Sequence, residues 1–355
     1  MKHAPIVVVC LPVLYGCAIE SRIDWPHATW ESVTTPSKAS LRGLAVVDAS
    51  VVWVGGAEGT LLRTVDGGQN WQNVAPPDSS KSDFRDIEVF DADQALAMVA
   101  GLPARIYRTA DGGKTWQVVH DDPRPKAFFD AMAFAGDRGY LFGDPIDGVF
   151  TLLTSADRGA TWTAVAAEVL PHPVGEEAGF AASGTCVAVH ADGAAEGQQA
   201  ADVALWIGTG GSASRCVRSL DGGTTWHATA LPLAQGAPAQ GAFGLAFKDR
   251  SAGVAVGGDY REPQATKGTA AWTADGGRSW RTVPGGAGGF RSAALWLGPD
   301  DVLAVGSHGS SLSRDRGRSW RPFGTDGFHS VAMGRDGSVW ACGSDGRVAR
   351  LALPQ

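Results

Sequence analysis

The chain has 355 residues, a formal net charge of −7 and a hydrophobic fraction of 44%. That fraction is enough to bury a substantial core, which excludes an intrinsically disordered chain. The acidic balance argues against nucleic acid as a partner, because phosphate binding requires a basic surface. The abundance of glycine (48 residues) and tryptophan (13 residues) is typical of many short strands joined by tight turns.

The first predicted element is an export signal in residues 1–17. Lys2 precedes an apolar run, Ala4 to Gly16, that is too short to span a bilayer as a mature helix. The run ends in Leu-Tyr-Gly-Cys, which resembles the cleavage box of bacterial lipoproteins, where Cys17 would become the acylated first residue. An ordinary secretory signal is the alternative, because Tyr15 replaces the small or aliphatic residue usual in that box. Both readings predict an exported protein, periplasmic or anchored to the envelope.

Six copies of one motif, Ser/Thr-x-Asp-x-Gly-x-x-Trp, follow along the chain, with successive tryptophans 45, 46, 64, 54 and 40 residues apart. This spacing is close to the length of a four-stranded propeller blade. We expect each carboxylate to accept backbone N–H groups two residues on, the glycine to supply a positive φ, and the tryptophan to pack on a neighbouring sheet. The motif aspartates are therefore predicted to stabilise turns through hydrogen bonds and to have no catalytic or metal-binding role. These aspartates are Asp66, Asp111, Asp157, Asp221, Asp275 and Asp315.

Residues 25–355 divide into seven units of four strands, only six of which contain an Asp box. The predicted inner strands begin at Leu41 and near Phe84, Phe128, Phe180, Phe243, Phe290 and Phe328. The last unit has three strands, and residues 29–33 match fourth strands such as 115–119. The N-terminal strand is thus predicted to complete the last blade, because closure leaves no free sheet edge. The expected fold is all-β: a seven-bladed β-propeller of four-stranded antiparallel blades, closed by pairing of the N- and C-terminal strands.

The starts of the inner strands and the loops between second and third strands should share one face, opposite the Asp boxes. The long insertions 171–179, 231–241 and 260–268 belong to the same face, whereas 190–202 belongs to the Asp-box face. Polar and charged residues predicted around this channel mouth are Arg42, Arg85, Asp130, Asp144, Asp259, Tyr260, Arg291, His308 and His329. Two interpretations stay open: the arginines recognise an anionic or polypeptide partner, or the mouth is polar because it is wet and the arginines pair with carboxylates.

The Asp boxes, together with segments such as Leu41-Arg42-Gly43-Leu44 and Asp83-Phe84-Arg85-Asp86, resemble the photosystem II stability/assembly factor family, a relative of the bacterial neuraminidase repeat proteins. Phe142–Gly148 and Gly257–Tyr260 resemble loops of non-photosynthetic members, some of which are labelled oxidoreductases. The resemblance implies an exported, often lipid-anchored factor that uses an arginine-rich face to help assemble a membrane complex. Arg42, Arg85 and Arg291 would correspond to that face, although Asp130 takes the equivalent place in the third blade.

A sialidase-like glycoside hydrolase is the main alternative, and it requires three arginines, a tyrosine nucleophile with its glutamate, and an acidic proton donor. Only Tyr260 is expected on the mouth face, so we predict a binding protein that performs no catalysis. An oxidoreductase is less favoured, because a dinucleotide fingerprint and a haem motif are both missing. We expect no cofactor or metal, a polypeptide or membrane-protein complex as partner, and a monomer. Cys186 and Cys216 either pair within one blade or stay free.

Overall fold

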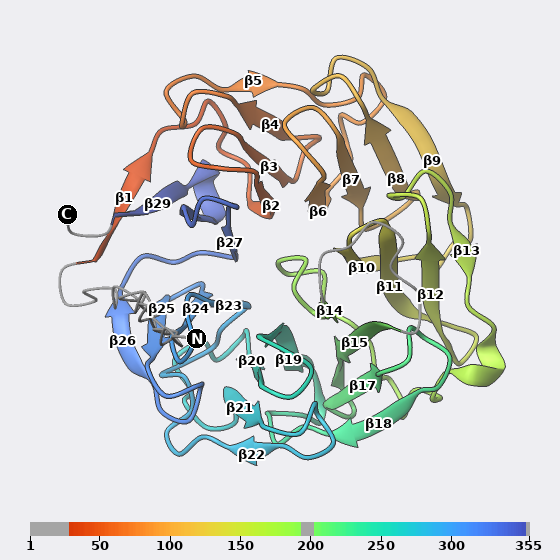
Figure 1. Cartoon of the computed structure of the whole chain (residues 1–355), viewed down its shortest axis with the longest axis vertical. Helices are drawn as coiled ribbons and strands as arrows, with labels where there is room; N and C mark the ends of the chain where they lie inside the picture. The colour runs from red at the N-terminus through yellow and green to blue at the C-terminus, as the bar shows by residue number, and fades with distance from the viewer. Residues whose placement is uncertain (1–27, 193–201, 353–355) are drawn as a thin grey trace, which may run out of the picture.

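The computed structural model of the protein describes residues 28–192 and 202–352. The predicted leader with Cys17, and most of the 190–202 loop, lie outside the described residues. Seven antiparallel sheets are arranged as blades around a common centre, with β2, β6, β10, β14, β19, β23 and β27 as the inner strands (Figure 1). This confirms the predicted all-β seven-bladed propeller of four-stranded blades.

In the first three blades the strands run outward in chain order. The first blade contains β2 (Leu41–Val46), β3 (Val52–Gly56), β4 (Leu61–Thr64) and β5 (Gln72–Asn73), and the second contains β6 (Phe84–Val89), β7 (Ala95–Val99), β8 (Ala104–Thr109) and β9 (Gln117–Asp122). The third contains β10 (Phe129–Ala135), β11 (Arg138–Ile146), β12 (Val149–Ser155) and β13 (Thr163–Ala164). The fourth blade contains β14 (Val187–Ala191), β15 (Val203–Gly208), β17 (Arg215–Ser219) and β18 (His227–Ala230). The fifth blade contains β19 (Ala237–Phe247), β20 (Gly253–Asp259), β21 (Ala270–Thr273) and β22 (Arg281–Thr282), and the short β16 (Gly210–Gly211) pairs with its inner strand β19. The last two contain β23 (Ala293–Trp296), β24 (Val302–Gly306), β25 (Gly309–Ser313), β26 (Arg321–Gly324); β27 (Ser330–Met333), β28 (Val339–Cys342), β29 (Val348–Ala352), β1 (Thr29–Val33). Two short 3-10 helices complete the described chain, η2 (Ala167–Val169) and η4 (Ser344–Gly346).

The strand register places the inner-strand starts and the Asp boxes at opposite ends of each blade. In the first blade, Leu41 pairs with Gly56 at one end of β3, and Thr64 pairs with Val52 at the other. The core lies between the blades, where each sheet buries both faces against its neighbours. Trp53, Trp206 and Trp340 on second strands are fully buried there, because flat rings fill the narrow space between adjacent sheets.

The seventh blade is closed as predicted, by pairing of β1 with β29 from Thr29–Ala352 to Val33–Val348. Trp30 packs on Phe328, with ring centroids 4.9 Å apart, and on Phe323 at 6.3 Å. Its indole N–H donates to the Ser310 hydroxyl of the sixth blade at 3.2 Å. The closing strand therefore joins both ends of the chain and also contacts the blade next to its own.

All six Asp boxes have the same local geometry. In the second blade, the Thr109 hydroxyl donates to Asp111 Oδ1 at 2.9 Å and accepts the Gly113 N–H at 3.0 Å. Asp111 Oδ1 also accepts the N–H of Thr115 at 2.9 Å. The carboxylate was predicted to accept the N–H two residues after the aspartate, and this spacing was wrong. The glycine turn instead brings the N–H of the fourth residue after the aspartate to the carboxylate. The Thr115 hydroxyl donates to Asp111 Oδ2 at 2.6 Å, and this bond together with the others favours the charged form and lowers the pKa of Asp111 to about 2.

The three cysteines of the propeller, Cys186, Cys216 and Cys342, are buried free thiols. Cys186 and Cys216 belong to different inter-blade clusters, which explains why they do not pair. Within residues 28–192 and 202–352, the helices are too short to cross a membrane.

Candidate binding site at the channel mouth

A recurring bulge directs four side chains toward the centre of the ring. The pairing of inner and second strands shifts by one residue at Arg42, Arg85, Asp130 and Phe243. A bulge inserts an unpaired residue and re-aims its side chain. All four bulged residues line one cavity of about 430 Å³, which we call the mouth cavity. Its full lining is Arg42, Arg85, Phe128, Asp130, Gly179, Phe180, Ala181, Ala182, Pro238, Phe243, Tyr260, Phe290, Ser292, Ser307 and His329.

One wall of the mouth cavity is aromatic. Phe180 and Phe243 stack with centroids 3.7 Å apart, and Phe290 meets Phe243 edge-on at 4.8 Å. Tyr260 adds a further edge contact to Phe243 at 6.0 Å and is 46% exposed. The phenylalanine that recurs near the inner-strand starts was the sequence signal for this wall, in addition to marking the strands.

The floor of the mouth cavity is formed by residues 179–185, which we call the floor segment. The predicted start of the fourth inner strand near Phe180 was wrong, because β14 begins at Val187. The chain ahead of β14 instead crosses the centre, where the Ser183 hydroxyl donates to the Ser292 carbonyl at 2.8 Å. The Ser330 hydroxyl donates to the Ser183 carbonyl at 3.0 Å. Long-range contacts to the sixth and seventh blades thus hold this segment out of the sheet.

The two arginines of the mouth cavity differ in their partners. Arg85 forms an ion pair with Asp83 at 2.7 Å and donates to the Ala181 carbonyl at 3.0 Å. Arg42 donates to the Ala182 carbonyl at 3.4 Å, and among the described residues it forms no ion pair. Burial, followed by repulsion from Arg85, lowers the pKa of Arg42. The carboxylate of Asp83, which pairs with Arg85, offsets part of this effect. Arg42 is therefore a partly desolvated cation that has no ion pair of its own among the described residues.

A carboxyl pair lies at the edge of the floor. Asp130 is fully buried, and burial together with the neighbouring Asp144 raises its pKa well above the ordinary range. Burial also raises the pKa of Asp144, whose Oδ1 accepts the Gly179 N–H at 3.1 Å. Burial and the neighbouring Asp144 therefore both favour the neutral form of Asp130.

His329 is also uncharged at neutral pH. Its Nε2 lies 3.0 Å from the Ser344 hydroxyl and 3.3 Å from that of Ser40. Burial, then the positive charges of Arg42 and Arg85, lowers the pKa of His329 to about 4. With Asp130 and His329 neutral and Arg85 paired with Asp83, Arg42 is the charged residue of the lining that has no ion-pair partner among the described residues.

The remaining predicted mouth residues do not line this cavity. Arg291 is buried, and its Nη2 donates to the Ser311 hydroxyl at 2.7 Å. Asp259 accepts the Arg261 N–H at 2.8 Å and thereby caps its own loop. His308 Nδ1 lies 2.9 Å from the exposed Ser307 hydroxyl. The structure thus brings together Arg42, Arg85, Asp130, Tyr260 and His329, with Asp144 behind Asp130.

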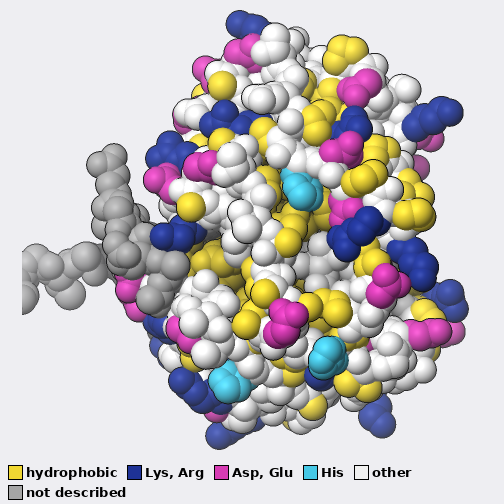
Figure 2. All heavy atoms as spheres, turned by 90° about the vertical axis from the view of Figure 1, so that its right-hand side faces the viewer, with side chains coloured by type: hydrophobic (Ala, Val, Ile, Leu, Met, Phe, Trp, Pro, Cys, Tyr) yellow, Lys and Arg dark blue, Asp and Glu magenta, His cyan; other side chains and the backbone are white. Residues whose placement is uncertain are grey.

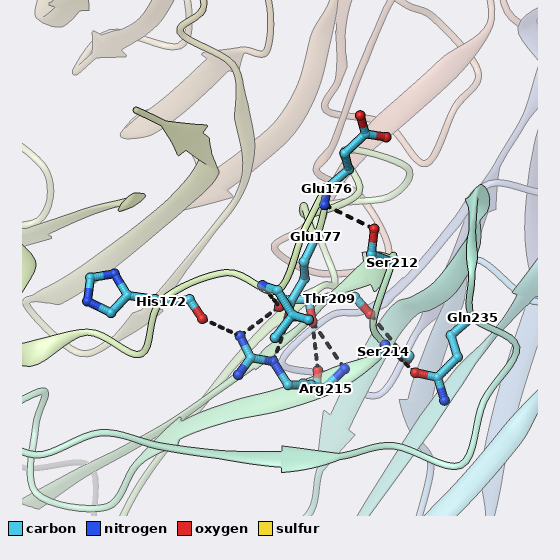
Figure 3. Close-up of polar contacts among 9 residues, drawn as sticks. His172, Glu176, Glu177, Thr209, Ser212, Ser214, Arg215 and Gln235 are labelled. Carbon is cyan, nitrogen blue, oxygen red and sulfur yellow. Dashed lines mark hydrogen bonds and ion pairs between the residues drawn. The ribbon is translucent and has the colours of Figure 1, made fainter. Parts of the chain in front are cut away.

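A second polar cluster secures the approach to the floor segment (Figure 3). Glu177 is fully buried and forms an ion pair with Arg215 at 2.6 Å. Its carboxylate also accepts the Val174 N–H at 2.9 Å and the Thr209 hydroxyl. Arg215 in turn donates to the His172 carbonyl at 2.8 Å. Each carboxylate oxygen of Glu177 accepts two hydrogen bonds, so this residue fixes the 171–178 loop and is not available to a ligand.

The outer side of the ring contrasts with the mouth. On the side near β9 and β13, acidic and basic side chains alternate and neither sign forms a continuous field (Figure 2). Pairs such as Arg158–Asp137 at 2.5 Å and Arg105–Asp121 at 3.1 Å account for part of this balance. Within the described chain, His, Cys, Asp and Glu side chains form no group of three suited to a metal ion.

Comparison with known proteins supports the fold and the family resemblance. Residues 24–125 match the model of the family described as photosynthesis system II assembly factor YCF48. No curated protein matches the sequence. Among solved structures, YCF48 bound to a D1 peptide is 17% identical, with a TM-score of 0.62 over 90% of this chain and 94% of that one. YCF48 from Cyanidioschyzon merolae is 16% identical, with a TM-score of 0.62 over 90% and 98%.

An enzyme also shares the architecture. The GH74 xyloglucanase from Xanthomonas campestris is 18% identical, with a TM-score of 0.60 over 91% of this chain and 53% of the enzyme. At these identities the likeness shows the fold alone, so that the sequence match in residues 24–125 carries the family resemblance. The chain is an Asp-box β-propeller whose first blades carry the sequence signature of the photosystem II assembly factors, as its motifs had predicted.

Proposed function

We propose that the protein is an exported, non-enzymatic assembly factor that binds a polypeptide of a membrane or envelope complex at the mouth cavity. The observation that carries this proposal is Arg42, a partly buried guanidinium that has no carboxylate partner among the described residues. A buried charge is costly unless it is paired, so an acidic group from a ligand would stabilise it. YCF48 bound to a D1 peptide supports a polypeptide as the class of ligand.

Export is part of the same proposal, and it rests on the apolar run that ends at Cys17. Cell fractionation of the wild type and of Cys17→Ser tests it. A lipid-anchored protein would move from the membrane to the soluble exported fraction in the variant, whereas a secreted protein would be unaffected. Recovery of both proteins in the cytoplasm would contradict export.

Charge reversal tests the binding site. We expect Arg42→Glu to reduce crosslinked capture of the partner complex from host membranes at least tenfold, because a favourable charge contact becomes repulsive. The loss should shrink as salt rises, since charges are screened beyond about 8 Å at physiological ionic strength. Arg321→Glu is the matched control, because it changes the net charge equally at an exposed position on β26. Equal capture by both variants would contradict the proposed site.

The alternative that the protein is a glycosidase is tested by substituting Tyr260, the tyrosine of the mouth cavity. Removing the Tyr260 hydroxyl in Tyr260→Phe should leave capture unchanged, because a broad interface depends little on one phenol oxygen. If the wild type hydrolysed a sialoside or a xyloglucan oligosaccharide and Tyr260→Phe did not, a nucleophilic role for Tyr260 would replace the binding proposal.

A further inference from the structure

The mouth cavity has two chemically different halves. The aromatic wall presents the partly exposed ring of Phe180 and the half-exposed ring of Tyr260. Phe128 and the guanidinium of Arg42 lie in the same lining. Apolar surface in contact with water is stabilised when a ligand covers it. A volume of about 430 Å³ falls within the range of about 300–1,000 Å³ that small-ligand sites occupy. A single salt link to Arg42 would leave most of this space filled with water.

The aromatic wall is built into the core and is therefore rigid. Phe243 and Phe290 are 3% and 5% exposed, and together with Ala182 of the floor segment they form one buried cluster. The floor beneath is fixed by the hydroxyls of Ser183 and Ser330. A preformed apolar pocket with few convergent polar groups binds with little ordering cost.

The charges of the cavity lining determine which kind of ligand group can lie next to the apolar side chain. Burial and the neighbouring Asp144 hold Asp130 in its neutral form, His329 is neutral, and Arg85 is paired with Asp83. Arg42 is thus the cation of the lining without an ion-pair partner among the described residues, which favours an anion there and disfavours a second cation.

We infer that the mouth cavity selects a polypeptide segment in which a large apolar side chain, aromatic or aliphatic, adjoins a carboxylate. The apolar side chain lies against Phe180 and Tyr260, which pack on the buried ring of Phe243, and the carboxylate meets Arg42. This inference rests on the proposed function, and it adds that the apolar side chain, beyond the charge, determines which segment is bound.

Four fluorescein-labelled Gly/Ser decapeptides test the inference by fluorescence anisotropy with the propeller carrying its full mature chain. Their central pairs are Glu-Phe, Glu-Ala, Lys-Phe and Lys-Ala. We expect Glu-Phe to bind at least tenfold more tightly than Glu-Ala, and both lysine peptides to bind more weakly than their glutamate counterparts. Equal Kd values for Glu-Phe and Glu-Ala, with the charge preference kept, would overturn this inference and leave the proposed function standing. Lack of binding by all four peptides would overturn both.

Two variants localise the effect. Ala182→Leu places extra volume in the pocket without removing a core ring, so the preference for Glu-Phe over Glu-Ala should fall below about threefold while the preference for glutamate over lysine remains. Tyr260→Ser removes an exposed ring and should weaken Glu-Phe binding selectively, with little effect on the melting temperature. The control Val118→Ser changes an exposed residue on the outer strand β9 and should bind like the wild type. An undiminished Glu-Phe preference in both pocket variants would show that the apolar side chain binds elsewhere.

Discussion

Trp30 provides the sharpest test of how the ring is closed. Replacing it with alanine removes ring contacts to Phe323 and Phe328 and the hydrogen bond to Ser310. A fully buried tryptophan costs about 3–5 kcal/mol on truncation. Trp30 is half-buried, so we expect a loss of about 2 kcal/mol in the free energy of unfolding. With an unfolding entropy of about 2.1 cal/mol/K per residue, this loss lowers the melting temperature by about 3 °C.

The matched control is Trp116→Ala, which truncates the equivalent residue of the second blade. That ring packs near Trp53 and Tyr107, and its N–H donates to the Val74 carbonyl at 2.7 Å. Circular dichroism melts of the wild type and both variants, with urea midpoints as a second measure, should show losses of similar size. If Trp116→Ala lowered the melting temperature and Trp30→Ala left it unchanged within about 1 °C, the N-terminal strand would not be contributing to closure in solution.

Two further predictions concern carboxylates. Asp315→Ala should lower the free energy of unfolding by about 1–3 kcal/mol, because the Ser319 N–H, 2.8 Å from Asp315 Oδ1, and the Ser313 hydroxyl lose their acceptor. Loss of partner binding in a normally folded variant, measured by the capture assay, would instead assign this aspartate a functional role. The raised pKa of Asp130 means that its protonated form stabilises the fold below the unfolded pKa of about 3.9, and that this contribution is lost as pH rises through the folded value. Asp130→Asn, which stays neutral, should therefore show a flatter dependence of the urea midpoint on pH above 4 than the wild type; identical slopes would mean that Asp130 does not titrate as its burial requires. The Asp boxes, whose pKa values are lowered, lose stability only as pH falls below about 4, so the two effects occupy separate pH windows.

The sequence alone determined the blade count, the ring closure and the turn positions. Each Asp box specifies its own turn through contacts within five residues, such as Thr109 to Asp111 and Gly113. Local hydrogen bonding and glycine conformation therefore encode it directly. The strand beginning at Thr29 was identified because it repeats a fourth-strand pattern that the last blade lacks. Repetition made both inferences secure, since six copies reduce the ambiguity of any one.

Only the tertiary structure decided which charged residues share a site. Arg42 and Arg291 both stand near an inner-strand start, but Arg42 occupies a bulge that turns it into the cavity. Arg291 precedes β23, which begins at Ala293, and its side chain turns inward to Ser311. The course of the floor segment likewise depends on contacts from Ser183 to Ser292 and Ser330, more than 100 residues away in the chain. The local sequence pattern does not encode such contacts. Phe180, predicted to begin a strand, therefore forms part of the aromatic wall of the mouth cavity instead.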